Sequence, residues 1–467
     1  MTKEKVKKIG TVDMLNGPFI PKILSFAVPV MLTGFLQLLY SSADLVVVGQ
    51  FSEHKNAAQA AISSTSALIN LIINLFMGLA VGINVAVARR IGAKNNEGVK
   101  RVIHTSAIVG LIGGVFVGVI GFFFARTFLE WMMCPEDVID LAALYMKIYF
   151  IGAPFNLLYN FFASVLRAKG ETKKPFAILA AAGLVNVLLN LIFVIGFKMS
   201  VDGVAIATVI SQAVSAVLVT VLLIRSPFPF KLSFKDLKVD KTSLADIVKI
   251  GLPAGVQGSM FSISNVIIQS TINSFGSIVL AANGNAVSIE GFLNVAVDAV
   301  YQATVSFIGQ NYGAARKKNI VKISIDAMIV CTAICLFMAA FVLLLRYPLL
   351  RIFSSSDEII EAGCKRFYIN VSFYAVFGWM QILVGMLRGL GHGIMPMVFS
   401  VLGVCVFRIV WIYTVFPLTK TIESVYWSYP VSWAITALAL LIGYLCVKKS
   451  TFKRMELSVS SDSSKAD

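Results

Sequence analysis

Twelve long apolar stretches, separated by shorter polar segments, follow one another along the 467-residue chain. A helix needs about 20 mostly apolar residues to cross the hydrocarbon core of a bilayer. Each stretch reaches that length, so the pattern predicts an all-α polytopic membrane protein. The twelve predicted transmembrane helices cover residues 20–50, 57–86, 102–131, 138–165, 174–197, 202–224, 247–275, 279–308, 321–346, 359–386, 394–417 and 424–447.

The composition agrees with this pattern. Hydrophobic residues make up 58% of the chain and charged residues only 14%, whereas a soluble protein carries about a quarter charged residues. The net charge of +16 does not indicate nucleic-acid binding, because the basic residues concentrate in short segments between apolar stretches. The basic segments are residues 89–101, 167–174, 225–249, 316–322 and 448–454. Such segments face the cytoplasm, so we expect a multi-pass protein of the cell membrane with both termini cytoplasmic.

The chain repeats itself after its sixth apolar stretch. LRAKGETKKP at 166–175 and LRGLGHGIMP at 387–396 share Leu, Arg, Gly and Pro, 221 residues apart. The same offset carries Gly92-Ala93 onto Gly313-Ala314. Six helices is an even number, so the two halves should be related by a pseudo-two-fold axis along the membrane normal. Substrate sites of transporters built from repeats lie near the midplane where the repeats meet.

The repeat predicts a division of the chain into five parts. These are a cytoplasmic lead (1–19), an N-terminal six-helix bundle (20–225), a cytoplasmic linker (226–246), a C-terminal six-helix bundle (247–447) and a cytoplasmic tail (448–467). We expect residues 452–467 of the tail to be disordered, because they are rich in serine and charge.

The first apolar stretch contains a carboxylate, Asp44, with no basic residue within six positions. A lone acid at membrane depth costs about 2.5–3.5 kcal/mol on insertion scales, so it rarely faces lipid. Gln37 and Tyr40 stand seven and four positions earlier, on the same helical face. One interpretation is a functional carboxylate, and the other is a buried acid that hydrogen-bonds for helix packing.

Other stretches of the first half supply polar partners for such an acid. Asn186 and Asn190 are one turn apart in the fifth stretch, and Thr208, Ser211 and Gln212 lie in the sixth. Hard cations such as Na⁺ bind oxygen ligands of this kind, and a protonated carboxylate would use the same neighbours. The alternative is ordinary hydrogen bonding between helices.

The second half carries its own charged residues inside apolar stretches. Glu290, Asn294 and Asp298 recur every four positions in the eighth stretch, and Arg408 is a cation in the eleventh. Glu290 and Asp298 are candidates for the substrate cavity. The alternative pairs Arg408 with Glu290, Asp298 or Asp326 as a structural ion pair.

Several functions are disfavoured by missing motifs. The chain has no G-x-x-x-x-G-K-[ST] motif, so ATP does not drive it directly. It also lacks H-E-x-x-H and G-x-S-x-G sites and a TVGYG-like channel filter. We therefore expect neither an enzyme nor a channel, and no cofactor.

Four segments together resemble the MATE (multidrug and toxic compound extrusion) family. Residues 29–49, PVMLTGFLQLLYSSADLVVVG, resemble its first helix, and NVLLNLIF at 186–193 resembles its fifth-helix motif. The two loops at 166–175 and 387–396 resemble its half-repeat loops. The resemblance covers residues 13 to 447. It implies twelve helices in two bundles and export of organic cations coupled to entry of H⁺ or Na⁺.

The resemblance also implies roles for individual residues. Asp44 would be the acid that takes the coupling ion, H⁺ or Na⁺, and Asn186, Asn190 and Thr208 would line the same site. Some members have an aspartate where this chain has Asn190, and a single carboxylate favours H⁺ over tight Na⁺ binding.

Gln37 and Tyr40 match polar positions of the family's first helix, on the cavity side. Glu290 resembles a second-half acid that would act as a counter-charge for the substrate. The expected partners are small organic cations and the lipid bilayer, not nucleic acid, and we expect a functional monomer. The alternative function is a lipid-linked oligosaccharide flippase of related architecture, which would need a broadly cationic cavity, whereas Arg408 is the main cation that the sequence suggests at membrane depth.

Overall fold

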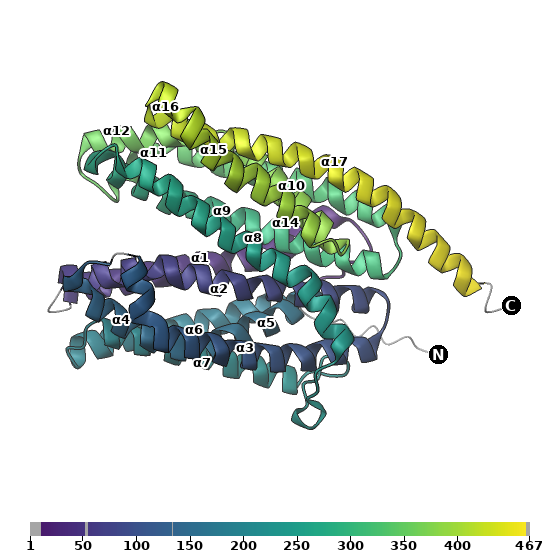
Figure 1. The fold of residues 1–467 in the computed structure, drawn as a ribbon. Coiled ribbons are helices and arrows are strands. Elements are labelled where there is room, and N and C mark those ends of the chain that lie inside the picture. The colour runs from purple at the N-terminus through teal and green to yellow at the C-terminus, as the bar shows by residue number, and fades with distance from the viewer. Residues whose placement is uncertain (1–10, 52–54, 133, 464–467) are drawn as a thin grey trace.

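The computed structural model describes residues 11–51, 55–132 and 134–463, and within them every regular element is a helix (Figure 1). The first half contains α1 (Phe19–Phe51), α2 (Lys55–Gly92), α3 (Asn96–Trp131), α4 (Glu136–Ile151), α5 (Ala153–Lys169), α6 (Lys173–Leu191), the π-helix η1 (Ile192–Gly196) and α7 (Val201–Ile224). A short 3₁₀ helix, η2 (Phe234–Asp236), lies in the connection. The second half contains α8 (Lys241–Asn273), α9 (Ser277–Gly313), α10 (Lys317–Leu344), α11 (Arg346–Arg351), α12 (Asp357–Arg366), the π-helix η3 (Phe367–Val371), α13 (Tyr374–Gly389), α14 (Ile394–Ser400), the π-helix η4 (Val401–Val406), α15 (Phe407–Thr414), α16 (Phe416–Thr419) and α17 (Ile422–Ser463).

These elements give the twelve spans that the sequence predicts. In the described part of the chain, nine helices are long and apolar enough to cross a membrane, and two bent helix pairs raise the number to eleven. The twelfth span is α8, a 33-residue helix that carries several polar residues. The outer surfaces of helices such as α3 and α10 expose large apolar side chains, including Phe123 and Phe337. Lipid tails would cover such side chains in a bilayer.

The fourth span of each half is bent at the same place. The angle between α4 and α5 is 48°, with Gly152 at the break. The angle between the α12–η3 helix and α13 is 47°, and Phe373, which lies 221 positions after Gly152, is at that break. The halves therefore share their local geometry as well as their sequence spacing.

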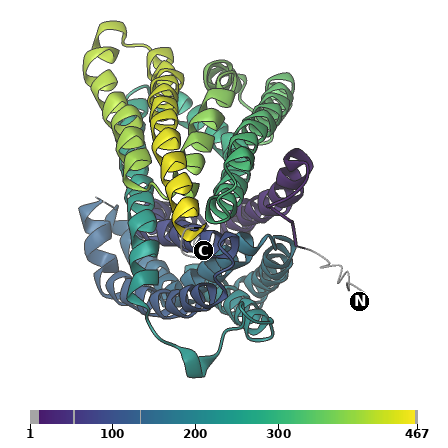
Figure 2. The same cartoon turned by 90° about the vertical axis from the view of Figure 1, so that its right-hand side faces the viewer.

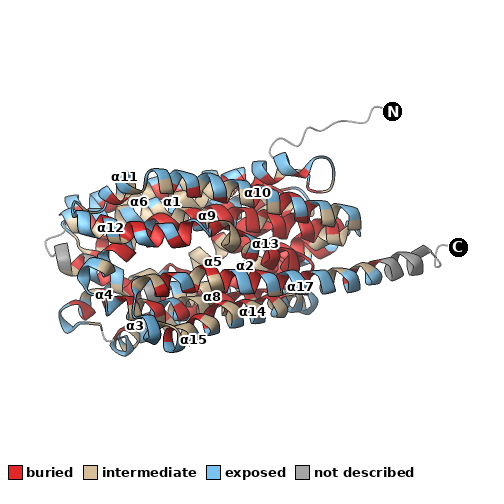
Figure 3. Ribbon diagram, turned by 90° about the horizontal axis from the view of Figure 1, so that it is seen from above, coloured by how far each residue is buried: buried red, intermediate tan, exposed pale blue. Residues whose placement is uncertain are grey.

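Figure 1 shows the two halves as two helical bundles, with the first half below the second. Figure 2 shows the same division in the perpendicular view. We call them the N bundle (α1–α7) and the C bundle (α8–α17). The two ends of the described chain lie toward the same end of the molecule, which we call the terminal end. Figure 3 shows the buried residues on the inner faces of the bundles and the exposed ones on the outside.

The bundles meet along a seam between α2 and α8 that is lined by glycine. A Cβ atom added to Gly78 would lie 2.0 Å from the backbone nitrogen of Gly255, and one added to Gly255 would lie 2.0 Å from the carbonyl oxygen of Leu75. Only glycine permits this approach, because any side chain would collide with backbone. The seam therefore brings the two helix backbones into direct contact.

A second contact between the bundles, at the terminal end, is reciprocal. A Cβ on Gly92 at the end of α2 would lie 1.9 Å from the carbonyl oxygen of Gln310 in α9. A Cβ on Gly313 at the end of α9 would lie 1.9 Å from the carbonyl oxygen of Arg89 in α2. Each member of one contact lies 221 positions from its counterpart in the other. The pseudo-two-fold axis therefore passes between these two helix ends.

The segment before α1 ties the bundles together at the same end. The backbone nitrogen of Val12 donates to the carbonyl oxygen of Gly170 in the N bundle at 2.9 Å. Asn311 in the C bundle donates its side-chain amide to the carbonyl oxygen of Met14 at 2.8 Å, and Met14 is buried. The segment 11–18 is therefore a strap across the closed terminal end.

The opposite end of the molecule is less tightly joined. The hydroxyl of Ser259 in α8 donates to the carbonyl oxygen of Leu71 in α2 at 3.3 Å. Farther from the terminal end than this bond, no hydrogen bond joins the bundles among the described residues. The molecule is thus closed at the terminal end and open between the bundles at the other.

The C-terminal tail differs from the expectation. We predicted disorder over 452–467, but α17 continues without a break to Ser463, and the last four residues lie outside the described part. Lys317 lies 6.0 Å from the ring centroid of Phe452, and Met455 is buried. These contacts with α10 explain why the helix persists past the predicted end of the twelfth span.

Candidate functional site

Asp44 lies inside the N bundle against the fifth span. Its Oδ1 accepts a hydrogen bond from the side-chain amide of Asn190 at 2.5 Å. No lysine or arginine forms an ion pair with it within the described ranges. The aspartate is half-buried, whereas Asn190 is completely buried. The structure thus keeps a carboxylate inside the bundle with an amide as its partner.

A chain of hydrogen bonds continues from Asn190 to the sixth span. Asn190 donates to the side-chain oxygen of Asn186 at 3.2 Å, and Asn186 donates to the hydroxyl of Thr208 at 3.4 Å. Thr208 uses its own proton on the carbonyl oxygen of Val204 at 2.9 Å. The four residues that the sequence analysis assigned to the ion site, Asp44, Asn186, Asn190 and Thr208, are therefore connected.

One atom of this chain has no partner. The side-chain oxygen of Asn190 is buried and accepts no hydrogen bond within the described structure. A buried polar atom without a partner costs about 1–3 kcal/mol. An oxygen with free lone pairs next to a carboxylate is a donor set that suits a small cation, so the residues fit H⁺ or Na⁺ at Asp44.

The other two predicted residues of α1 lie in different surroundings. The hydroxyl of Tyr40 donates to the carbonyl oxygen of Ala180 at 3.3 Å, and its ring occupies the space where a side chain at Gly183 would be. Gln37 is exposed on the same helix. Tyr40 therefore packs α1 against α6, while the side chain of Gln37 is exposed.

Glu290 forms a buried ion pair in the C bundle. The guanidinium of Arg366 donates to both of its oxygens, from Nε at 2.9 Å and from Nη2 at 2.7 Å. Its Nη1 donates to the side-chain oxygen of Asn283 at 2.8 Å. Glu290 is 7% exposed and Arg366 is 3% exposed. Glu290 is thus neutralised within the protein, in an arrangement that uses two-pronged hydrogen bonding.

This pairing bears on the alternative in which Arg408 forms a structural ion pair. Arg408 forms no ion pair with Glu290, Asp298 or Asp326 in the structure as described. Its Nε donates to the hydroxyl of Ser432 at 2.9 Å, and the guanidinium lies 4.0 Å from the ring centroid of Tyr429. The sequence analysis overlooked Arg366, because it lies at the end of a charged turn and not in the middle of an apolar run.

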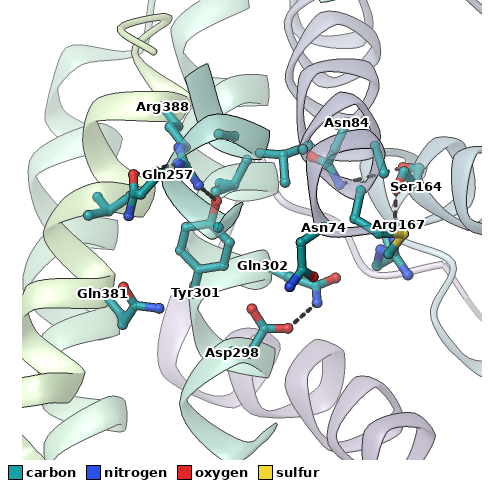
Figure 4. A pocket seen from close by; sticks show the side chains of 18 of the residues that line it. Asn74, Asn84, Ser164, Arg167, Gln257, Asp298, Tyr301, Gln302, Gln381 and Arg388 are labelled. Atoms are coloured by element: carbon teal, nitrogen blue, oxygen red, sulfur yellow. Dashed lines mark hydrogen bonds between the residues drawn. The ribbon is translucent and has the colours of Figure 1, made fainter. Parts of the chain in front are cut away.

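Asp298 lines a cavity of ≈ 340 Å³ between the two bundles (Figure 4). Its carboxylate accepts a hydrogen bond from Gln302, one turn later in α9, at 2.5 Å. The aspartate is exposed to the cavity. Of the predicted residues, Asp298 is the one that the structure places where substrate sites of repeat-built transporters lie.

Two arginines that the sequence analysis did not propose line the same cavity, Arg167 and Arg388. Arg167 donates to the hydroxyl of Ser164 at 2.6 Å, and Arg388 donates to the hydroxyl of Tyr301 at 2.6 Å (Figure 4). The pair is 221 positions apart, in the repeated LR of the two half-repeat loops. The repeated Leu-Arg pair could have indicated these arginines, but it was taken only as a sign of two equivalent loops. Arg408 is therefore not the main cation at membrane depth.

Three comparisons with known proteins agree with this architecture. The MatE family model matches residues 29–192 and 253–414, which together form most of the chain. The chain is 27% identical over 430 residues to Probable multidrug resistance protein YoeA of Bacillus subtilis, with 90% of the chain and 92% of the relative covered. It is 25% identical over 440 residues to the multidrug export protein MepA of Staphylococcus saprophyticus, with 93% and 96% covered.

Solved structures show the same fold. A MATE transporter in a bent conformation matches with a TM-score of 0.88 at 22% identity, over 95% of this chain and 99% of that one. A MOP superfamily transporter from Pyrococcus furiosus matches with a TM-score of 0.87 at 22% identity, over 96% and 98%. The chain is thus a multi-pass membrane protein with the two-bundle fold, and it belongs to the MATE family of multidrug efflux transporters.

Proposed function

We propose that the chain is a secondary-active antiporter that exports small organic cations in exchange for entering H⁺ or Na⁺. The observation that carries the proposal is Asp44, a carboxylate inside the N bundle that has an amide partner and no basic one. Curated relatives named for multidrug resistance and export support the export of small molecules. The coupling ion and the cationic nature of the substrate belong to the proposal alone.

Ion binding at Asp44 would change both its charge and its hydrogen bonds. A proton or Na⁺ would neutralise the carboxylate and weaken the charge-assisted bond from Asn190. Asn190 also contacts Asn186, so the chain to Thr208 would rearrange and alter the packing of α1 against α6 and α7. Such a change drives transport only as far as ion and substrate affinities differ between the two orientations of the bundles.

The proposal includes an orientation in the membrane. The terminal end carries the basic segments, which face the cytoplasm in proteins of this kind. With both termini cytoplasmic in the cell membrane, the closed terminal end would be the inner gate, and the described conformation would face outward. We further propose that a single chain is the transport unit, because both halves of the interbundle cavity come from one chain.

The donor set leaves the choice between the two ions to experiment. A single carboxylate favours H⁺, whereas the unpartnered oxygen of Asn190 offers a ligand to Na⁺. The two ions would use the same residues, so only the imposed gradient separates them.

Efflux from proteoliposomes tests the proposal. Vesicles that contain the purified protein and a fluorescent organic cation are given a pH gradient or a Na⁺ gradient, one at a time. We expect one of the two gradients to drive transport, and Asp44→Asn to abolish the driven component. Wild-type rates from Asp44→Asn, or no response of the wild type to either gradient, would contradict the proposal.

A further inference from the structure

The C bundle contains a second cavity, which adjoins the one between the bundles because Phe261 and Gln381 line both. It has a volume of ≈ 360 Å³ and is lined by residues of α8, α9, α12, α13, α17 and the segment η4–α15. Its charged residues are Glu290, Arg366 and Arg408. Since Glu290 and Arg366 neutralise each other, the wall carries one net positive charge, on Arg408.

The guanidinium of Arg408 is held in place, but only one of its nitrogens donates a hydrogen bond within the described structure. Its Nε donates to Ser432, and its face lies over Tyr429 at 4.0 Å and toward Trp433 at 5.8 Å from the ring centroids. Neither of its two terminal nitrogens donates a hydrogen bond to any residue in the described part of the chain. Arg408 is only 4% exposed. A buried, oriented guanidinium with free donors at a cavity wall matches the geometry that binds a carboxylate.

The rest of the wall suits an aromatic ligand. Five aromatic side chains line the cavity around Arg408: Phe261, Tyr374, Phe377, Tyr429 and Trp433. Rings of this kind give a ligand a large apolar contact area, and they prefer offset or edge-on arrangements. The side-chain amides of Asn265 and Gln269 add hydrogen-bonding groups on the α8 side. The cavity is large enough for a drug-sized compound, since ligand pockets start at about 300 Å³.

We propose that this cavity binds the carboxylate of small aromatic compounds, with Arg408 as the residue that recognises the charge. The inference deepens the proposed transport function by naming a second substrate class, namely aromatic compounds that bear an anionic group. It rests on that function only for transport, because binding needs no ion gradient. An organic cation would gain nothing from Arg408.

Binding of three matched fluorescent probes tests the inference. Dansylglycine is an anion, its methyl ester is neutral and dansylethylenediamine is a cation, and all three carry the same ring system. Each is titrated into the purified full-length protein in lipid nanodiscs, with energy transfer from tryptophan as the readout. We expect wild type to bind dansylglycine at least about tenfold more tightly than the ester, since a charge-assisted hydrogen bond contributes about 1.5–3 kcal/mol.

Variants test whether Arg408 causes the difference in affinity between dansylglycine and its methyl ester. Arg408→Gln should weaken dansylglycine by about 10- to 100-fold and leave the ester within about twofold. Arg408→Lys keeps the positive charge but loses the paired N–H donors of the guanidinium. Its affinity for dansylglycine should fall between those of wild type and Arg408→Gln. Arg346→Gln is the matched control, because Arg346 also stacks on tyrosine rings but does not line the cavity, and its affinities should match wild type.

The outcomes separate this inference from the antiport proposal. The inference would be overturned if wild type bound the acid and the ester with equal affinity. It would also be overturned if Arg408→Gln lost affinity for all three probes to the same extent. If Arg408→Gln does not fold, Arg408→Lys decides the question, because wild-type affinity for dansylglycine in that variant would overturn the inference. Selective binding of the acid together with a failure of both gradients to drive efflux would leave the inference standing and remove only the antiport.

Discussion

The side-chain amide of Asn190 lies 2.5 Å from Oδ1 of Asp44, and the two residues come from helices 146 positions apart in the chain. The contact joins α1 to α6 inside the N bundle. The same amide group also bonds Asn186, so both of its hydrogens are in use while its oxygen has no partner. The position of Asn190 therefore affects both the surroundings of the Asp44 carboxylate and a buried oxygen that has no partner among the described residues.

Asn190→Asp should raise the preference for Na⁺. The substitution places a second carboxylate against Asp44, and two carboxylates at that distance do not both ionise unless a cation lies between them. We expect the Na⁺ concentration for half-maximal efflux to fall by about tenfold, which corresponds to about 1.4 kcal/mol. Na⁺ titration in proteoliposomes at constant pH measures it. Asn190→Ala serves as the control, since it removes the amide without adding charge, and an equal shift in both variants would refute the prediction.

Glu290→Gln should strongly destabilise the protein if the acid is structural. Removing one partner of a buried ion pair leaves the other charge uncompensated, which costs about 3–5 kcal/mol. The double variant with Arg366→Gln should recover part of that loss. Thermal unfolding of the purified protein in detergent measures both.

The chain offers a matched control for this pair. Arg351 and Asp357 also form an ion pair, at 2.9 Å, but their side chains are 68% and 80% exposed. Asp357→Asn should change the stability by no more than about 0.5 kcal/mol, as exposed pairs usually do. Normal stability of Glu290→Gln combined with lost transport would instead assign Glu290 to the substrate.

Gly313→Val should open the terminal end. Its side chain would meet the carbonyl oxygen of Arg89, and overpacking of this kind costs about 1–3 kcal/mol, enough to change the ratio of the two conformations by about 5- to 150-fold. Distances between spin labels placed at the terminal ends of the two bundles measure the shift. Gly284→Ala, in the same helix but with nothing within 4 Å of the added atom, should leave the distances unchanged.

Asp298→Asn should weaken the binding of organic cations without loss of stability. The carboxylate faces the interbundle cavity and contacts Gln302, so the variant removes charge from the cavity and little packing. We expect the affinity for a cationic dye to fall by about tenfold, measured by fluorescence anisotropy. Asp137→Asn, on the exposed first turn of α4, should bind the dye as the wild type does. Unchanged affinity in Asp298→Asn would exclude this aspartate from the substrate site.

The sequence predicted the spans well because length and apolarity determine them directly. Eleven spans satisfy both criteria, and α8 was found from its apolar segments despite its polar residues. The bends were not predicted. Gly152 marks the first bend, but a glycine in an apolar run also occurs at unbent positions such as Gly110 in α3. A bend depends on the packing of neighbouring helices, which a single sequence does not contain.

Part of the candidate site could also be predicted from the sequence, and part could not. Asp44, Asn186, Asn190 and Thr208 were grouped from helical spacing and the family resemblance, and the structure places them in contact. Their roles stay predictions. The sequence left open an ion pair of Arg408 with Glu290, Asp298 or Asp326, and the described structure has none. Helical periodicity shows which residues share a face of one helix, but not which face of a neighbouring helix they meet. Arg167 and Arg388 were missed because their position at a loop hid the fact that both side chains reach the cavity.

The reciprocal contact of Gly92 and Gly313 makes opening of the terminal end an all-or-none event. Each helix end packs a glycine against the backbone of the other helix, Gly92 of α2 against Gln310 of α9 and Gly313 of α9 against Arg89 of α2. A rotation that lifts one end from its seat therefore lifts the other by the same amount.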